Sequence, residues 1–151
     1  VPSAREIEVS MLGNEEPSAA MPGEIITSRE FYDYAAKYLD EGEEASELLI
    51  PAPLDAEMTK KAQDMAIEAY LAIDGAGMAR VDFLLSDETG ELYLNEVNTI
   101  PGFTSISMYP KLWEASGVSY TRLLSWLIDL ALERHRENMR SERVFRPDEV
   151  L

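Results

Sequence analysis

The sequence predicts an α+β fold, because it contains strand-like segments that turns can join and longer segments with helical spacing. Residues 78–85 and 92–97 are apolar and strand-like, and the turn sequence SDETGE between them favours an antiparallel hairpin. Residues 55–73 and 119–132 carry apolar side chains at helical intervals. With 151 residues, the chain is long enough for one domain with a hydrophobic core.

The remaining strand-like segments are short. Residues 7–12 (IEVSML) alternate weakly between apolar and polar side chains and precede a Gly-Asn turn. Residues 21–27 are therefore expected to pair back as a second strand. Residues 48–50 are apolar and are followed by two nearby prolines, which fits an edge strand because proline cannot donate to a sheet ladder.

Two segments in the first half of the chain have helical spacing. In residues 28–45 (SREFYDYAAKYLDEGEEA), Ser28 is a candidate cap for a helix with apolar positions at Phe31, Tyr34, Ala35, Tyr38 and Leu39. The helix over residues 55–73 is clearer, with Asp55 as its N-cap and Gly75 as its end. Its expected apolar stripe is Met58, Ala62, Met65, Ala66, Ala69 and Ile73.

The second half of the chain predicts two further helices. Pro110 opens a short helix, and Ser119 or Thr121 caps a longer one. The apolar stripe of the longer helix is expected to be Leu123, Leu124, Leu127, Ile128 and Ala131. Residues 133–151 are mostly charged and predict a polar helical extension and tail.

Composition excludes several classes of function. The net charge of −16 and the isoelectric point near 4.3 leave no basic surface for nucleic acid or for an anionic membrane. The absence of cysteine and the single histidine, His135, exclude disulfides, thiolate chemistry and a multi-histidine metal site. No apolar run has membrane-spanning length, so a cytoplasmic location is expected. The abrupt start at Val1 suggests part of a larger protein.

Polar residues gather on the predicted hairpin. Side chains alternate along a strand, so one face of the first strand carries Arg80, Asp82 and Leu84, and one face of the second carries Leu92, Leu94, Glu96 and Asn98. A loop centred within SDETGE places Asp82 opposite Glu96 and Arg80 opposite Asn98. Val81, Phe83 and Leu85 then occupy the reverse face.

This polar group has two interpretations. Facing carboxylates repel each other, and Mg²⁺ relieves that repulsion because it accepts carboxylate and amide oxygens and leaves positions for substrate phosphates. In that case Arg80 can neutralise a developing anion. Alternatively, Arg80 pairs with Asp82 or Glu96 in an ordinary surface ion network. The spacing alone does not choose between them.

Several longer stretches resemble the C-terminal part of the D-alanine–D-alanine ligase family, which has the ATP-grasp fold. They are AREIEVSMLGN, FYDYAAKY, RVDFLL and LYLNEVNTIPGFTSISMYP, followed by the Leu-rich helix, and they occur in family order from about residue 5 to residue 132. The resemblance implies a C-terminal ATP-grasp subdomain over residues 1–132, with a mostly antiparallel sheet backed by helices, and an extension over residues 133–151. It places FYDYAAKY in a mobile active-site loop, in disagreement with the helix that its periodicity predicts.

The resemblance also implies roles for individual residues. Asp82, Glu96 and Asn98 match Mg²⁺ ligands, with Glu96 bridging two ions, and Mn²⁺ is an alternative metal. Arg80 matches the arginine that stabilises the transferred phosphoryl group, and Gly102 matches a backbone N–H donor to the substrate carbonyl.

Further matched positions bind the two substrates. Ser107 and Met108 match the positions that hold the carboxylate of the second D-alanine, although Ser107 could equally cap a turn. Lys37 and Tyr32 match contacts to ATP, Tyr38 matches a tyrosine that closes over the substrates, and Glu6 falls near the nucleotide. Ala35 departs from the family, which commonly has an acidic residue there, so altered closure of the loop is expected.

The implied activity is the ATP-dependent ligation of two D-alanines through an acylphosphate, for peptidoglycan precursor synthesis, with a homodimer as the expected assembly. The family's N-terminal and central domains are not part of this chain, so little activity is expected of it alone. Two alternatives stay open: another ATP-grasp carboxylate–amine ligase, and a non-catalytic folded or interaction fragment. Tyr38 favours D-alanine over a hydroxy acid as second substrate.

Overall fold

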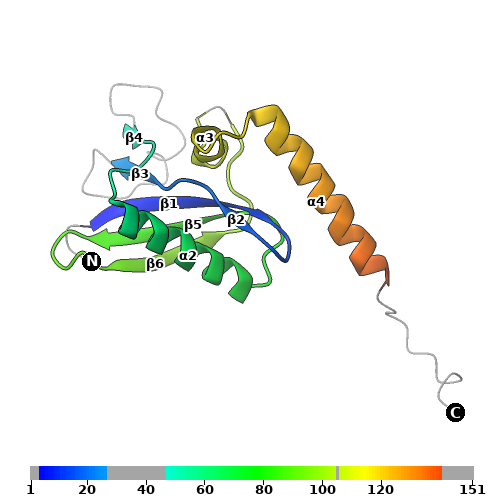
Figure 1. Cartoon of the computed structure of the whole chain (residues 1–151), viewed down its shortest axis with the longest axis horizontal. Helices are drawn as coiled ribbons and strands as arrows, with labels where there is room; N and C mark the ends of the chain where they lie inside the picture. Colours follow the sequence, from blue (N-terminus) through cyan, green and yellow to red (C-terminus); the bar gives the residue numbers. More distant parts are fainter. Residues whose placement is uncertain (1–3, 27–46, 105, 141–151) are drawn as a thin grey trace, which may run out of the picture.

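A six-stranded antiparallel sheet forms the centre of the computed structural model, which describes residues 4–26, 47–104 and 106–140. Along the sheet the strands lie in the order β4 (Glu47–Leu49), β3 (Gly23–Ile26), β1 (Ala4–Gly13), β5 (Gly77–Ser86) and β6 (Leu92–Asn98), and β2 (Ser18–Ala19) pairs with the end of β1 (Figure 1). The predicted α+β class and antiparallel hairpins are confirmed.

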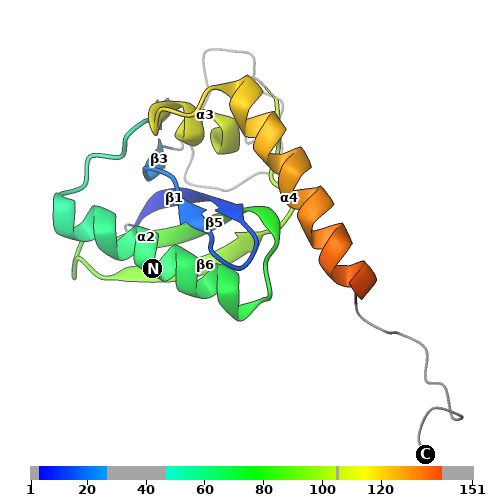
Figure 2. The same ribbon diagram turned by 45° about the vertical axis from the view of Figure 1, so that its right-hand side comes forward.

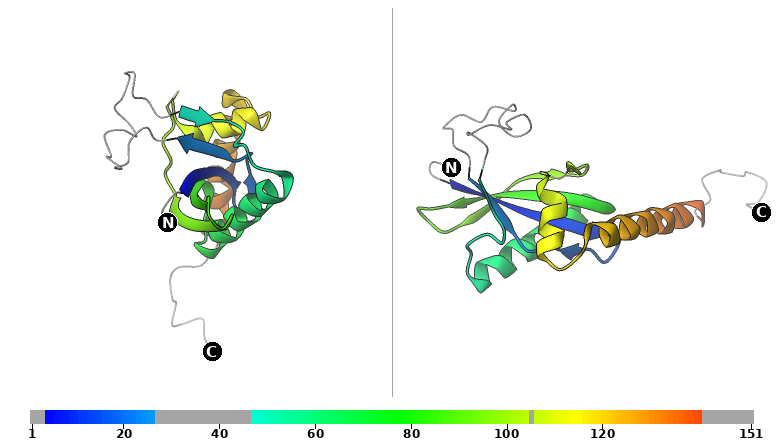
Figure 3. Two further views of the ribbon diagram at one scale, coloured as in Figure 1. Left: turned by 90° about the vertical axis from the view of Figure 1, so that its left-hand side faces the viewer. Right: turned by 90° about the horizontal axis from the view of Figure 1, so that it is seen from above.

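The helices divide between two hydrophobic clusters. Helix α2 (Ala56–Ala72) lies along the sheet (Figure 2) and covers alternate residues of β1, namely Ile7, Val9 and Met11. Helices α3 (Met108–Ala115) and α4 (Tyr120–Arg140) form a second cluster around Leu12, at the far end of β1. The C-terminal part of α4 extends past the sheet (Figure 3).

Most predicted boundaries are confirmed to within a few residues. The side chain of Asp55 caps α2, accepting a hydrogen bond from the backbone N–H of Met58 at 2.7 Å. Ser119 begins the last helix rather than Thr121, because its carbonyl accepts the N–H of Leu123 at 2.9 Å. Helix α3 starts two residues before Pro110, and the short strand β2 was not predicted. The predicted helix in residues 28–45 lies outside the described residues.

The predicted apolar stripes are only partly correct. On α2, Ala62 and Ala66 are buried as expected, but Ile73 is exposed and the buried Tyr70 was not predicted. On α4, Leu123 is buried, whereas the predicted core residues Leu124, Ile128 and Ala131 are exposed. Leu127 is partly buried as predicted, and Trp126 and Leu130 are partly buried although they were not predicted, because the contacts with α3, β5 and β1 select that side of the helix.

Helix α4 runs without a break from Tyr120 to Arg140 and therefore crosses the predicted domain division at residue 132. That division stays a prediction. Among the described helices, none combines the length and the apolar composition that crossing a bilayer requires.

Two buried tyrosines fasten the helices to β1. Tyr70 of α2 donates a hydrogen bond to the carbonyl of Gly13 at 2.9 Å, and Tyr109 of α3 donates to the carbonyl of Met11 at 3.0 Å. Burial raises the pKa of Tyr70 to about 12 and raises the pKa of Tyr109 further.

These tyrosines predict a loss of stability at alkaline pH. An unfolded tyrosine ionises near pH 10, whereas the folded chain keeps both protons, so unfolding releases protons only above that pH. The free energy of unfolding should be unaffected by Tyr70 below pH 10 and should fall by about 1.4 kcal/mol per pH unit for each buried tyrosine between pH 10 and 12. Urea denaturation from pH 9 to 12 measures this slope.

Tyr70→Phe removes one of the two buried tyrosines and should therefore make the fall of the unfolding free energy with pH shallower by the contribution of one tyrosine. Identical slopes for the native chain and Tyr70→Phe would contradict the proposed cause.

Candidate metal centre

Polar side chains gather on the face of β1, β5 and β6 opposite α2. Glu8 lies opposite Asp82, and Asp82 lies opposite Glu96, so three neighbouring strands contribute one carboxylate each to a single row. The adjacent row consists of Ser10, Arg80 and Asn98. We call these six residues the polar rows. The predicted opposition of Asp82 to Glu96 and of Arg80 to Asn98 is confirmed.

A β-bulge in β6 directs the carboxylate of this strand to the polar face. Glu96 pairs with Asp82, but Leu94 pairs with Phe83, so Asn95 is an extra residue between the two pairs. One extra residue reverses the alternation of side chains. Leu92 therefore packs in the core with Phe83, and the prediction that Leu92 and Leu94 share a face with Glu96 and Asn98 is wrong.

Arg80 lies at the centre of the polar rows and binds two carboxylates. Its Nε and Nη2 atoms donate to Oδ1 and Oδ2 of Asp82, each at 2.7 Å, and its Nε lies 3.2 Å from Oε1 of Glu8. All three side chains are buried. The pairing of Arg80 with Asp82 agrees with the ion-network interpretation, but its burial does not fit a surface network. Burial strengthens these charge interactions and fixes the guanidinium in place.

The carboxylates around Arg80 also suit a metal ion. Ligand oxygens of Glu6, Glu8 and Asp82 all lie within 4.8 Å of one another. A donor set made only of oxygen atoms suits Mg²⁺ or another hard cation. The exposed Glu96 and the half-buried Asn98 extend this set onto β6, the strand at the edge of the sheet.

Sequence reasoning missed Glu8. The signal was the alternation of Glu6, Glu8 and Ser10 with apolar residues in β1, which indicates a strand with one polar face. Placing Glu8 beside Asp82 further requires the long-range antiparallel pairing of β1 with β5. No local pattern gives that register.

The predicted substrate-binding turn follows β6 directly. The side-chain oxygen of Asn98 accepts the N–H of Ile100 at 3.2 Å, which starts the turn. Gly102 lies so close to Ser107 that a Cβ at residue 102 would be 2.9 Å from the Ser107 hydroxyl oxygen. The structure therefore brings Gly102 and Ser107 together, with the buried Met108 as the first residue of α3.

Ser107 also agrees in part with the alternative interpretation that it caps a turn. It occupies the N-cap position of α3, but its hydroxyl makes no capping hydrogen bond. The hydroxyl oxygen instead accepts the N–H of Thr104 at 3.0 Å and lies 2.8 Å from the Thr104 hydroxyl. The remaining predicted site residues, Tyr32, Lys37 and Tyr38, lie outside the described residues.

Comparisons with known proteins identify the family to which the sequence is similar. The family described as "D-ala D-ala ligase C-terminus" matches residues 1–129. A D-alanine–D-alanine ligase of Thermoanaerobacter sp. (strain X514) is 64% identical over 137 residues, which cover 91% of this chain and 38% of the relative. The corresponding ligase of Heliobacterium modesticaldum is 59% identical over 139 residues, covering 92% of this chain and 37% of the relative.

Solved structures show the same similarity. The D-alanine–D-alanine ligase of Coxiella burnetii superposes with a TM-score of 0.77 at 40% identity, covering 91% of this chain and 34% of that chain. The VanG D-Ala:D-Ser ligase of Enterococcus faecalis superposes with a TM-score of 0.73 at 38% identity, covering 86% and 37%. The chain thus spans less than two fifths of the length of these proteins.

Proposed function

The chain belongs to the family of D-alanine–D-alanine ligase C-terminal domains, and we propose on that basis that it forms the metal-binding part of an ATP-dependent ligase. One observation carries this proposal. In the polar rows, the buried side chains of Glu8, Asp82 and Arg80 lie next to Glu96 and Asn98 of β6, which offer further oxygen ligands for a metal ion. The chain spans 38% of the Thermoanaerobacter relative, so the complete reaction requires the remaining part of the enzyme.

In this proposal, Asp82, Glu96 and Asn98 hold one or two Mg²⁺ ions, and Glu8 supports them from β1. A bound Mg²⁺ ion would neutralise part of the negative charge on the phosphate groups of ATP, and Mn²⁺ could serve in its place. Two observations support this assignment: the register places Glu96 opposite Asp82, and oxygen atoms of Glu6, Glu8 and Asp82 lie within 4.8 Å of one another.

Other residues of the chain would act on the substrates directly. Arg80, held by Asp82 and Glu8, presents a fixed positive charge to the phosphoryl group. The N–H of Gly102 would donate to the carbonyl oxygen of the reacting D-alanine, and the absence of a Cβ at this residue lets the Ser107 hydroxyl lie beside it. Ser107, next to Gly102, would hold the carboxylate of the second D-alanine with the help of the Met108 N–H.

The proposed reaction has two steps. The carboxylate of the first D-alanine attacks the γ-phosphorus of ATP, which gives an acylphosphate and ADP. The amine of the second D-alanine then attacks the acyl carbon, a proton leaves the nitrogen, and inorganic phosphate departs. Lys37 and Tyr32 are proposed to contact ATP, with Glu6 near the nucleotide and Tyr38 closing over the substrates.

The second substrate is proposed to be D-alanine. The structures of a D-Ala–D-Ala ligase and a D-Ala:D-Ser ligase are similar to this chain at nearly equal identity, 40% and 38%, so they do not separate the two substrates. The relatives at 59–64% identity are D-alanine–D-alanine ligases, which favours D-alanine. A role in peptidoglycan precursor synthesis in the cytoplasm and a homodimeric assembly follow from the same resemblance and stay predictions.

Glu96→Gln should weaken the binding of Mg²⁺–ATP by about tenfold or more, because it removes a charged ligand from the proposed metal site while leaving the buried pairs intact. The measurement is calorimetric titration of Mg²⁺–ATP into this chain and into a full-length chimaera. The chimaera consists of the N-terminal part of the Thermoanaerobacter ligase followed by this chain. Glu88→Gln, on the exposed hairpin turn, is the matched control.

Each outcome of the titration has a distinct meaning. Binding by the chimaera alone, lost in Glu96→Gln, means that the site needs the missing part of the enzyme. Binding by both proteins, lost in Glu96→Gln, means that the polar rows form the site unaided. Absence of binding in the chimaera, or equal binding by Glu96→Gln and Glu88→Gln, would contradict the proposed function.

A further inference from the structure

The side chains of Thr104 and Ser107 meet in the turn that leads into α3. Their hydroxyl oxygens lie 2.8 Å apart, a distance typical of a hydrogen bond between two hydroxyl groups. The backbone N–H of Thr104 also donates to the Ser107 hydroxyl oxygen at 3.0 Å, and the N–H of Ser107 donates to the Thr104 carbonyl at 3.1 Å. Thr104 is therefore the direct neighbour of a predicted substrate-binding hydroxyl, although the sequence assigned it no role.

The first residues of α3 explain why the Ser107 hydroxyl is directed to Thr104 rather than to the helix. A capping side chain accepts the N–H of the second or third helical residue. The third residue of α3 is Pro110, which has no N–H. Ser107 accordingly makes no capping hydrogen bond, and its hydroxyl is held beside Thr104 and Gly102 instead.

The hydrogen-bonding capacity of a serine hydroxyl limits what Ser107 can bind. The hydroxyl has one proton to donate and two lone pairs that accept. One lone pair accepts the N–H of Thr104. If the Thr104 hydroxyl donates to the second lone pair, the Ser107 proton is left for another group, whereas a Ser107 hydroxyl that donates to Thr104 has no proton left. Because an ionised carboxylate only accepts hydrogen bonds, it can bind the Ser107 hydroxyl only in the first arrangement.

We propose that Thr104 is a positioning residue for the second D-alanine and acts through Ser107. This inference rests on the proposed function, in which Ser107 holds the carboxylate of that substrate. When the carboxylate binds, the Thr104 hydroxyl donates to the Ser107 oxygen, and the Ser107 hydroxyl donates to the carboxylate. Each hydrogen bond in such a chain polarises the next one and strengthens it. Thr104 itself makes no contact with the substrate in this arrangement.

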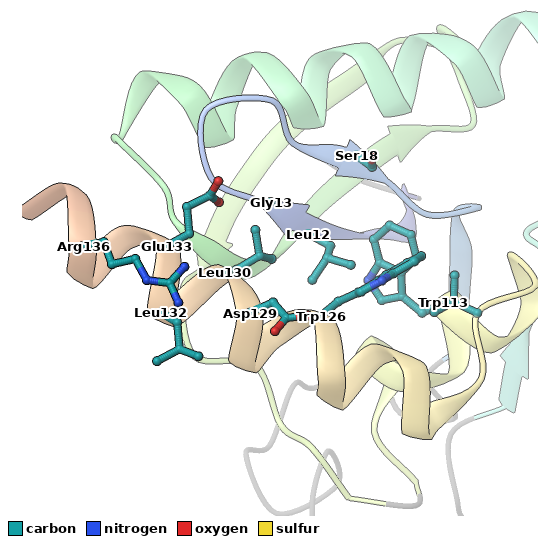
Figure 4. Close-up of a pocket in the computed structure, with 11 residues that line it drawn as sticks. Leu12, Gly13, Ser18, Trp113, Trp126, Asp129, Leu130, Leu132, Glu133 and Arg136 are labelled. Atoms are coloured by element: carbon teal, nitrogen blue, oxygen red, sulfur yellow. The ribbon is translucent and has the colours of Figure 1, made fainter.

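The turn and α3 are held in place by contacts that do not involve the Thr104 side chain. The ring centroid of Phe103 lies 5.6 Å from that of Tyr109 and 5.3 Å from that of Tyr120. Near the other end of α3, Trp113 is buried and lines a cavity of about 640 Å³ between α4 and the end of β1 (Figure 4). The backbone of the turn is therefore anchored on both sides.

The exposure of the two residues also suits this role. Ser107 is half-buried, so a ligand can reach its hydroxyl, and Thr104 is exposed. Loss of the Thr104 hydroxyl should therefore change the direction of the Ser107 proton and leave the fold intact. In the chain alone, Thr104→Val should leave the melting temperature nearly unchanged.

The test measures the rate of phosphate release by the full-length chimaera described above, at varied D-alanine and Mg²⁺–ATP. A two-site fit to the D-alanine dependence gives a KM for each D-alanine. Thr104→Val keeps the shape of the side chain but removes its hydroxyl, and it should raise the KM for the second D-alanine about three- to tenfold. The KM for Mg²⁺–ATP and the KM for the first D-alanine should not change. Thr104→Ser restores a hydroxyl and should restore the native KM.

A double-mutant cycle shows whether Thr104 acts through Ser107. Ser107→Ala should raise the KM for the second D-alanine by itself. Adding Thr104→Val to Ser107→Ala should then have no further effect, because the hydroxyl that Thr104 orients is already absent. Thr121→Val is the matched control, since it removes the hydroxyl of an exposed threonine on α4, and it should leave every KM unchanged.

Two results would overturn the inference while the proposed function holds. The first is a chimaera that ligates D-alanine with the same KM values after Thr104→Val. The second is a set of effects in which Thr104→Val and Ser107→Ala simply add, because Thr104 would then act only by stabilising the turn. A chimaera that forms no D-alanyl-D-alanine would instead contradict the proposed function, and the inference would fall with it.

Discussion

Arg80→Met should lower the free energy of unfolding by about 3–5 kcal/mol, because it removes one partner from a buried charge network. The guanidinium makes two hydrogen bonds with Asp82 and lies 3.2 Å from a carboxylate oxygen of Glu8, and all three side chains are buried. Methionine fills a similar volume but supplies no charge or donor. Both carboxylates then remain in a buried setting without this guanidinium. Urea denaturation at pH 7 measures the change.

Arg134→Met is the control for the Arg80 substitution. Arg134 donates to Asp74 at 3.1 Å, but both side chains are substantially exposed, and an exposed pair contributes at most about 1 kcal/mol. Mg²⁺ should restore part of the stability of Arg80→Met, since a cation that binds only the folded chain shifts the equilibrium toward it. A loss no larger than that of Arg134→Met would show that the buried network is not what stabilises this face.

The sequence predicted that Asp82 lies opposite Glu96, but not the register of the hairpin next to its turn. Leu85 pairs with Leu92 there, so an unbroken ladder would place Asn95 opposite Asp82, and the bulge at Asn95 restores the predicted pairing. The bulge at Asn95 could not be deduced, because an extra residue changes the backbone without leaving a distinctive side-chain pattern. Glu8 was missed because its place beside Asp82 depends on pairing between strands that are far apart in the sequence.

Helix α4 shows a different limit of sequence reasoning. Its apolar residues occupy two sides, one that includes Leu123 and Trp126 and one that includes Leu124 and Ile128. Periodicity detects a helix in both cases but does not say which side is buried within this domain. The contacts with α3, β5 and β1 make that choice.

One face of β5 contributes to the hydrophobic core, and the other contributes to the proposed metal site. Phe83 and Val81 point into the core under α2, whereas Asp82 and Arg80 belong to the polar rows. Substitutions on the two faces of the same strand should therefore have different consequences. This distinction allows stability and ligand binding to be tested separately.

Phe83→Ala should destabilise the chain by about 3–5 kcal/mol, because it leaves a cavity beneath α2 in the fully buried core. That is a large share of the 5–15 kcal/mol typical of a domain. Tyr93→Ala, at a partly exposed position on the neighbouring β6, should cost less than about 1 kcal/mol. Urea denaturation gives both values, and similar losses for the two variants would contradict the assignment of Phe83 to the core.

The Phe83→Ala variant should keep the affinity for Mg²⁺–ATP of its parent chimaera as long as it remains folded, because the cavity lies on the face opposite the polar rows. Glu96→Gln should show the reverse behaviour, losing affinity while keeping its stability, because Glu96 is exposed and lies outside the core. If Phe83→Ala lost affinity in proportion to its stability, the metal site would depend on the packing beneath β5. The two faces would then form one cooperative unit, since a strained β5 would move Asp82 and Arg80 together.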